Sequence, residues 1–194
     1  MRTLVIFCAV LASVYTYSEA CSCFPQHPQV QFCNADFVIK AKVLKRRETG
    51  PSQSDDVIYT VKIIQNYKRD RYYRGRRVQQ IFTASNSALC GSFFEIGREY
   101  IITGSIRENR WRTNLCSWNL PTTSLTQYQK NALKSGVYKN SCSCNVEVCF
   151  GGQCPEPSRD KCVVNQGADL SCFFRENSCE RNRKSCAWRS PACF

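Results

Sequence analysis

The chain has 194 residues, a formal net charge of +12 and 15 cysteines. We find no apolar stretch of the roughly 20 residues that a membrane-spanning helix needs, and so many cysteines are typical of a disulfide-stabilised extracellular protein rather than a cytosolic one. The positive charge predicts attraction to polyanions, which outside the cell are sulfated glycosaminoglycans rather than nucleic acid. Simple solubility explains the same charge equally well.

The first 20 residues have the pattern of a secretory signal peptide. After a short basic start, Leu4–Val14 is apolar, and Ser18-Glu19-Ala20 places small residues where a signal peptidase cleaves. We therefore expect residues 1–20 to be removed, the protein to be secreted, and the mature chain to begin at Cys21. Cys8 leaves with the signal, so 14 of the 15 cysteines remain.

This even number of cysteines predicts a disulfide framework. Structural zinc explains the cysteines poorly, because the mature chain has a single histidine, His27, and no paired CxxC motifs. Cys21 and Cys23 are separated by one residue, so each is expected to bond elsewhere in the fold rather than to the other. Spacing alone leaves the pairing of the remaining cysteines open.

The chain after Cys21 predicts one short helix and then a series of strands. Pro28 favours the first turn of a helix within residues 26–35, and His27 is interpreted as a hydrogen-bonded residue at the helix start. β-branched and alternating runs then predict five strands, at residues 37–44, 57–65, 78–84, 100–106 and 111–115.

Polar and small residues predict the connections between these strands. Lys45–Asp56 contains Gly50-Pro51 and is expected to be a loop. Asn66–Arg77 is expected to be a second loop, rich in arginine and tyrosine, and Ser85–Gly91 an exposed turn that ends in a disulfide.

A capped helix is predicted after the strands. Thr123 or Ser124 would begin it, and it would run to about Lys134 and stop at Gly136. Five short strands and a capped helix within about 120 residues are typical of a small β-barrel, and an OB-fold is the expected form. We assign this mainly β domain, with its short helices, to residues 21–142.

Residues 143–194 are predicted to form a small disulfide-rich C-terminal domain. From Cys142 to the end there are 9 cysteines in 53 residues and few apolar runs. A core of that size cannot hold a domain together alone, so the bridges must do so. The three tryptophans, Trp111, Trp118 and Trp188, are interpreted as core residues.

An enzyme is not expected. The chain has no HExxH motif, no free cysteine is expected in its mature form, and its single histidine has no visible partners for a catalytic triad.

Residues 21–42 read CSCFPQHPQVQFCNADFVIKAK. This stretch resembles the opening signature of the tissue inhibitors of metalloproteinases, C-x-C-x-P-x-H-P-Q followed by F-C-N-x-D and V-I-K-A-K. The likeness continues through residues 88–91, 142–144 and 185–188. It implies an OB-fold inhibitory domain of the netrin type, a smaller disulfide-rich domain, and a secreted inhibitor of matrix metalloproteinases and related metalloproteinases.

The resemblance also implies which residues act. The free amine and carbonyl of Cys21 would chelate the catalytic zinc of the protease and displace its water, and Ser22 would enter the pocket on the primed side of the scissile bond. The protein would have no cofactor of its own. The other residues implied to contact the protease are Cys23, Phe24, Pro25, Asn34, Ser87, Ala88 and Leu89.

A pairing of the cysteines follows from the same resemblance. The family pattern implies the bridges Cys21–Cys90, Cys23–Cys116, Cys33–Cys142, Cys144–Cys186, Cys149–Cys154 and Cys162–Cys172. Cys179 and Cys193 are left over, and we predict that they bond each other.

One alternative function stays open. A netrin-like module of the extracellular matrix could bind heparin through its basic surface without inhibiting a protease, because a fold does not fix a function. Such a module need not begin with a free cysteine, so Cys21 favours the inhibitor. The candidate polyanion-binding residues are Lys68, Arg69, Arg71, Arg74, Arg76 and Arg77.

Overall fold

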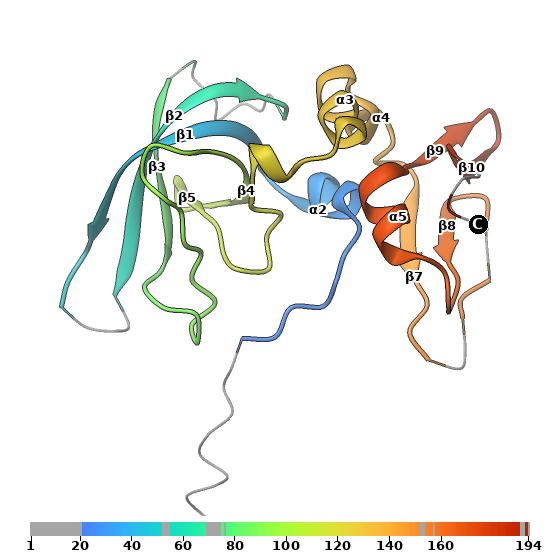
Figure 1. The fold of residues 1–194 in the computed structure, drawn as a ribbon, viewed down its shortest axis with the longest axis horizontal. Coiled ribbons are helices and arrows are strands. Elements are labelled where there is room, and N and C mark those ends of the chain that lie inside the picture. The colour runs from blue at the N-terminus through green and yellow to red at the C-terminus, as the bar shows by residue number, and fades with distance from the viewer. Residues whose placement is uncertain are drawn as a thin grey trace, which may run out of the picture.

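The computed structural model describes residues 21–51, 55–68, 75, 77–151, 154–156, 158–190 and 193. Figure 1 shows a large curved sheet on the left, a smaller group of strands on the right, and helices between them. We call residues 21–142 the first region and residues 143–194 the second region. The predicted signal peptide lies outside the described residues.

Five strands of the first region close into a ring. Neighbours pair in the order β1-β2-β3-β5-β4, and β1 also pairs with β4. All of these pairings are antiparallel except that of β3 with β5. The mainly β prediction is confirmed, and the ring is consistent with an OB-like barrel. The strands are β1 (Phe37–Glu48), β2 (Asp56–Asn66), β3 (Val78–Ala84), β4 (Glu99–Arg107) and β5 (Arg110–Arg112), and β6 (Leu120–Pro121) adds to β4.

The prediction of a loop over Lys45–Asp56 is wrong for five residues. Lys45 pairs with Thr60 and Glu48 with Val57, so β1 continues to Glu48, and Asp56 begins β2. The register shifts between Val43 and Lys45, and such an irregularity bends a strand without ending it. The polar side chains at this end of β1 are largely exposed, which a strand tolerates when one of its faces meets solvent.

The inside of the ring is an apolar core. Phe37 stacks on Trp111 with ring centroids 4.4 Å apart, and both side chains are buried. Burying a large apolar side chain contributes about 1.5–3 kcal/mol. Trp111 is therefore a core residue, as predicted. The core also contains Ile39, Val43, Tyr59, Val61, Ile81, Phe94, Tyr100 and Ile102.

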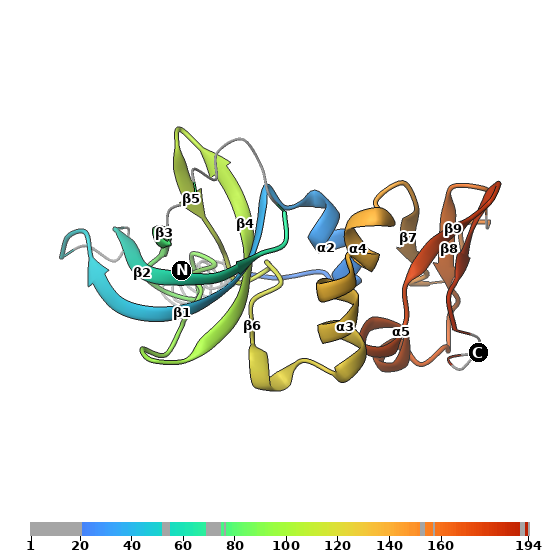
Figure 2. The same cartoon turned by 90° about the horizontal axis from the view of Figure 1, so that it is seen from above.

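Three helices of the first region pack against the outside of the ring. Figure 2 shows α2 (Pro28–Asn34), α3 (Gln127–Ser135) and α4 (Val137–Asn140) between the ring and the strands of the second region. The predicted helix at Pro28 is confirmed. A second apolar cluster joins these helices to the outer face of β1 and β4 and includes Phe32, Val38, Ile101, Trp118, Leu133 and Tyr138.

The start of α3 differs from the prediction. Thr123 and Ser124 lie in a short 3-10 helix, η1 (Thr122–Ser124), and the residue that caps α3 is Thr126. The Thr126 side chain accepts a hydrogen bond from the Gln129 backbone N–H, and the Gln129 side chain accepts one from the Thr126 backbone N–H. This reciprocal capping box outweighs a lone hydroxyl two residues earlier. Gly136 ends α3 with a φ of 79°, as predicted.

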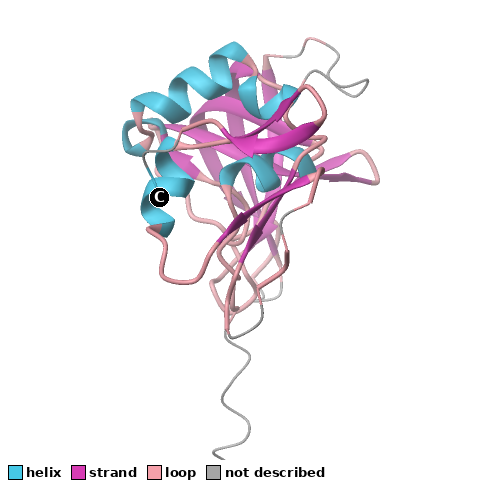
Figure 3. Cartoon of the chain, turned by 90° about the vertical axis from the view of Figure 1, so that its right-hand side faces the viewer, coloured by secondary structure: helices cyan, strands magenta, loops and turns pink. Residues whose placement is uncertain are grey.

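The described residues of the second region form two small sheets and one helix. β7 (Asn145–Val148) pairs in parallel with β8 (Lys161–Val164), and β9 (Cys179–Asn182) pairs antiparallel with β10 (Ser185–Trp188). The helix α5 (Leu170–Glu176) faces the first region. Figure 3 shows that the helices of both regions gather in the upper half of the view.

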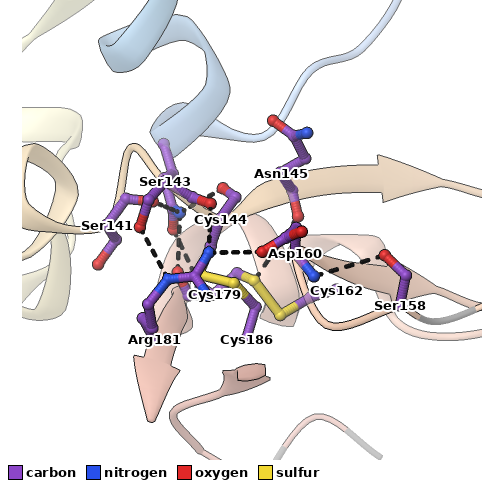
Figure 4. A network of polar contacts seen from close by, with 11 residues as sticks. Ser141, Ser143, Cys144, Asn145, Ser158, Asp160, Cys162, Cys179, Arg181 and Cys186 are labelled. Atoms are coloured by element: carbon purple, nitrogen blue, oxygen red, sulfur yellow. Dashed lines mark hydrogen bonds and ion pairs between the residues drawn. A yellow bond between two sulfur atoms is a disulfide. The ribbon is translucent and has the colours of Figure 1, made fainter. Parts of the chain in front are cut away.

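A polar network holds the two small sheets together. Arg181 of β9 donates to the Ser143 carbonyl at 2.9 Å and forms an ion pair with Asp160 at 2.8 Å. Figure 4 shows these contacts beside the disulfides of the region. Beneath them lies a cluster of buried cysteine side chains, Cys144, Cys162, Cys179 and Cys186.

Five of the seven predicted bridges are confirmed and two are wrong. Cys162 bonds Cys179, and Cys172 bonds Cys193, instead of the predicted Cys162–Cys172 and Cys179–Cys193. Cys172 lies in α5 and packs against the cluster of Val164, Phe173 and Cys193, whereas Cys162 and Cys179 lie in the other cluster. Each observed bridge therefore joins cysteines of one cluster. The confirmed bridges are Cys21–Cys90, Cys23–Cys116, Cys33–Cys142, Cys144–Cys186 and Cys149–Cys154.

Candidate functional site

The segment before α2 is extended and tied down at two points. Cys21 bonds Cys90 and Cys23 bonds Cys116, so Ser22 is flanked by disulfides on both sides. Ser22 is exposed and Cys21 is partly exposed. In Figure 1 this segment is the dark-blue stretch that leads away from α2 along the lower side of the molecule.

The two disulfides lie against each other. The sulfur of Cys21 is 3.9 Å from that of Cys116, and the Cys116 sulfur is 4.0 Å from the Ser22 carbonyl oxygen. The sulfurs of Cys21, Cys90 and Cys116 are close enough together to suggest a metal site. Each of them is oxidised in a disulfide, however, and a thiolate is the form of cysteine that binds metal.

A rigid turn lies beside Cys21. The Asn86 side chain accepts a hydrogen bond from the Leu89 N–H at 3.0 Å, and the Gly91 N–H donates to the Asn86 carbonyl at 2.8 Å. A Cβ at Gly91 would stand 2.2 Å from the Ala84 carbonyl oxygen, so only glycine fits there. The turn presents three exposed residues, Ser87, Ala88 and Leu89.

Two grooves flank this turn. One, of about 480 Å³, is lined by residues that include Asn34, Leu89 and Cys116. The other, of about 620 Å³, runs between Ser87–Leu89 and the facing ends of β1 and β2. The fold therefore brings Asn34 close to the turn, although the two are far apart in the sequence.

An ion pair ties together the strands beneath the turn. Arg112 of β5 contacts Asp56 at the start of β2 at 2.6 Å, and Asp56 pairs in register with Ala84, where β3 leads into the turn. Arg112 lines the first groove and Asp56 the second. The pair links β5 to β2 beside the turn.

Phe24 is an exposed aromatic residue of the N-terminal segment, with 67% of its surface accessible. Its ring meets Phe150 of the second region edge-on, with centroids 4.5 Å apart. Sequence reasoning missed Phe150. Neither its neighbours nor its spacing indicates a contact with a segment about 125 positions earlier in the chain.

His27 anchors the inner end of the segment. Its Nδ1 accepts a hydrogen bond from the Gln29 N–H at 3.1 Å, so Nε2 carries the proton and donates to the Phe173 carbonyl at 3.0 Å. Burial lowers the pKa of His27 from 6.5 to about 4, and the backbone carbonyls of Phe173 and Asn177 offset part of that effect. The predicted role as a hydrogen-bonded residue at the helix start is confirmed.

Gln29 joins the same helix to the second region. Its side-chain NH₂ lies 3.0, 3.2 and 2.8 Å from the carbonyl oxygens of Ser141, Cys144 and Cys179. Its carbonyl oxygen accepts from the Cys179 N–H at 2.9 Å. The amide is fully buried, and its hydrogen bonds fix the first turn of α2 to the second region.

The predicted polyanion-binding loop is only partly described. Lys68 donates to the carbonyls of Cys33, at 2.7 Å, and Ala35, which places its charge at the C-terminal end of α2, where a helix favours a cation. Arg77 is exposed. The residues of this loop that lie outside the described part are Arg69, Arg71, Arg74 and Arg76.

Among the described residues, no helix is long and apolar enough to cross a membrane.

The chain is similar to known proteins along most of its length. A metalloproteinase inhibitor 3 from Gallus gallus is 34% identical over 151 residues, which cover 75% of this chain and 68% of the relative. A metalloproteinase inhibitor 2 from Homo sapiens is 33% identical over 193 residues, which cover 92% and 86%. The family model described as tissue inhibitor of metalloproteinase matches residues 19–192. This chain therefore belongs to the tissue inhibitors of metalloproteinase, a family of inhibitors and not of enzymes.

Proposed function

We propose that this protein is a secreted inhibitor of zinc metalloproteinases, matrix metalloproteinases among them, and that Cys21 at its processed N-terminus binds the protease's catalytic zinc. The proposal rests on the two disulfides that lie on either side of Ser22, Cys21–Cys90 and Cys23–Cys116. Two disulfides hold the first residues of the expected mature chain in an extended, exposed form beside the turn at Ser87–Leu89.

The chemistry requires a free amine at Cys21. A catalytic zinc in a metalloprotease is held by three protein ligands, and its fourth position holds the water that attacks the substrate. The amine nitrogen and carbonyl oxygen of Cys21 would close a five-membered chelate ring there in place of that water. An α-amino group has a pKa of about 7.7–8.0, so it loses its proton readily near neutral pH. An internal peptide nitrogen cannot act in this way.

The residues present fit this role. The Cys21 sulfur is used in the bond to Cys90, so the backbone atoms are the ligands that the residue can offer. The same bond fixes Cys21 to the turn that follows β3. The ligand atoms are thus held in one place before binding, and little conformational entropy is lost when the complex forms.

The neighbouring residues would provide the rest of the interface. Ser22 would enter the first primed pocket, and its small hydroxyl would fill that pocket incompletely, which favours broad over narrow specificity. Cys23, Phe24 and Pro25 would continue along the substrate groove. Ser87–Leu89 would contact the opposite side of the cleft, with Asn34 at its edge.

The broader assignments belong to the same proposal. We assign residues 21–142 to an inhibitory domain with a netrin-like OB-fold and residues 143–194 to a second domain. No cofactor belongs to the protein itself, and the zinc is the protease's own. The charge of +12 supports a further role for the basic surface in retaining the inhibitor on sulfated glycosaminoglycans of the matrix.

The test adds one alanine before Cys21. The extra residue converts the amine into a peptide nitrogen and leaves both disulfides in place, so we expect inhibition of a matrix metalloproteinase to fall by at least about a thousandfold, as expected for the loss of a metal ligand. The measurement is the inhibition constant, with circular dichroism as the control for folding. A folded variant that inhibits as well as the mature protein would rule out chelation by Cys21.

A further inference from the structure

A groove of about 720 Å³ lies outside the ring, between the end of β2, the strand β4 and the helix α3. It shares no lining residue with the three grooves that border the N-terminal segment or the turn after β3. In Figure 1, α3 stands at the top of the view, whereas the N-terminal segment runs along the lower side. A ligand in this groove would therefore leave the proposed inhibitory segment uncovered.

The floor of the groove is apolar. Ile101 of β4, Leu125 and Leu133 of α3 all line it, and all three are buried members of the apolar cluster outside the ring. Ile64, near the end of β2, lines the same groove and is 46% exposed. The volume falls within the range of about 300–1,000 Å³ that is typical of small-molecule sites. The groove therefore suits the apolar chain of a small ligand.

Two lysines of α3 stand beside this floor. Lys130 and Lys134 line the groove and are exposed, and their spacing of four places both on one face of the helix. Like charges at this spacing destabilise a helix. Within the described residues neither lysine forms an ion pair, whereas Lys40, which also lines the groove, pairs with Glu99 at 2.9 Å. The fold thus leaves two positive charges uncompensated next to an apolar surface.

Hydroxyl groups complete the lining. Tyr67, Thr122 and Thr123 all border the groove, and the Tyr67 backbone N–H donates to the Val38 carbonyl at 2.9 Å, which fixes the residue beside β1. Burial raises the pKa of Tyr67, although the charge of Lys40 offsets part of that effect. The phenol therefore stays protonated at neutral pH and is able to donate a hydrogen bond.

We propose that this groove binds a long-chain fatty acid, with its acyl chain against the apolar floor and its carboxylate beside Lys130 and Lys134. The argument is complementarity of both apolar surface and charge. A sulfated polysaccharide would satisfy the lysines but would leave the apolar floor without a partner, and an uncharged lipid would do the reverse. This site is additional to protease inhibition and does not depend on it.

The test titrates the mature protein with oleate and follows binding by isothermal titration calorimetry. We expect one saturable site with a dissociation constant below about 100 μM, the affinity that burial of a single acyl chain alone supplies. Octanoate has the same carboxylate and a shorter chain, so it should bind at least about tenfold more weakly. Absence of saturable oleate binding in this range would overturn the inference.

Charge variants test the role of the lysines. The double variant Lys130→Glu, Lys134→Glu should raise the dissociation constant for oleate at least about tenfold, because it replaces attraction by repulsion. Lys42→Glu with Lys139→Glu is the matched control: it changes the net charge equally, and both lysines are exposed and lie outside the groove. An equal loss in the two double variants would show attraction to the overall charge and would overturn the site.

A second pair of variants tests the apolar floor. Ile64→Ser should weaken oleate binding about tenfold, whereas Val78→Ser, at a residue that is 51% exposed and does not line the groove, should leave it within twofold. Circular dichroism checks that each variant is folded. An Ile64→Ser variant that binds oleate as tightly as the natural protein would contradict the placement of the acyl chain.

Two further measurements separate this site from the other surfaces of the molecule. Saturating oleate should leave inhibition of a metalloproteinase within twofold, because the groove lies away from the N-terminal segment. Competition between oleate and the protease would place the fatty acid elsewhere and overturn the assignment. Binding of a heparin fragment that requires Lys130 and Lys134, without any binding of oleate, would assign the lysines to a polyanion surface instead.

Discussion

The two regions of the molecule use disulfides for different purposes. In the first region the ring is filled by large apolar side chains such as Phe37, Trp111 and Tyr59, and its disulfides lie outside that core, where they fix the N-terminal segment and α2. In the second region one buried cluster consists of four cysteines, and the other joins Cys193 to Val164 and Phe173. Disulfides thus position a functional segment in one region and form much of the buried core in the other.

The largest expected effect is the loss of a ring core residue. Phe37→Ala removes a buried ring stacked on Trp111 and should lower the free energy of unfolding by about 4 kcal/mol. Urea unfolding followed by tryptophan fluorescence measures this. Phe93→Ala, on an exposed phenylalanine, should cost less than about 0.5 kcal/mol. If the two variants were equally stable, burial would not be what holds the first region together.

Removing a bridge from the second region should have a smaller and local effect. The double variant Cys162→Ser, Cys179→Ser opens a loop with a sequence separation of 17 and should cost about 3 kcal/mol. Hydrogen exchange should speed up in β7–β10 but not in the ring.

The bridge Cys149–Cys154, with a separation of 5, provides the matched comparison. Its removal should cost only about 2 kcal/mol. Equal acceleration of exchange in the ring strands would show that the two regions are not stabilised independently.

The smallest effect concerns the boundary between the regions and depends on pH. The pKa of His27 is about 4 in the folded protein against 6.5 as its ordinary value. Between these two pH values the unfolded chain therefore binds more protons than the folded protein. The contribution of His27 to the free energy of unfolding is fully present above pH 6.5 and is lost as the pH is lowered toward 4. Protonation of Nδ1 would also remove the acceptor for the Gln29 N–H.

We expect His27 to contribute a loss of about 2 kcal/mol between pH 7 and pH 5. The measurement is the free energy of unfolding at both pH values for the natural protein and for His27→Asn, whose side-chain oxygen can still cap α2. The free energy of unfolding of the variant should change between pH 7 and pH 5 by about 2 kcal/mol less than that of the natural protein. The same difference in both proteins would mean that His27 does not titrate in this range.

The features that the sequence predicts well are those set by local chemistry. Alternation in runs such as Val57–Gln65 marks one face of a strand as buried, and Pro28 and Gly136 have backbone preferences that fix helix ends. The spacing of Cys21 and Cys23 disfavours a bond between them. The bridges at the N-terminal segment followed from the family resemblance, because its motif fixes those positions closely.

The features that the sequence does not predict depend on contacts between distant segments. Lys45–Glu48 stays in β1 because β2 provides partners for it, and no local signal distinguishes those residues from a loop. Cys172 and Cys179 are seven positions apart, but Cys172 lies in α5 and Cys179 begins β9, and the two pack with different buried clusters. Their partners, Cys193 and Cys162, follow from these distant contacts. The contact of Phe24 with Phe150 arises in the same way.

The most direct test of the account concerns the coordination of the protease's metal. A matrix metalloproteinase catalytic domain carrying cobalt in place of zinc has visible absorption bands that depend on the ligands of the metal. Chelation by Cys21 predicts that these bands change when the mature protein beginning at Cys21 binds, and that they stay unchanged with the variant carrying one added alanine. Inhibition by the mature protein without any change in the bands would contradict it.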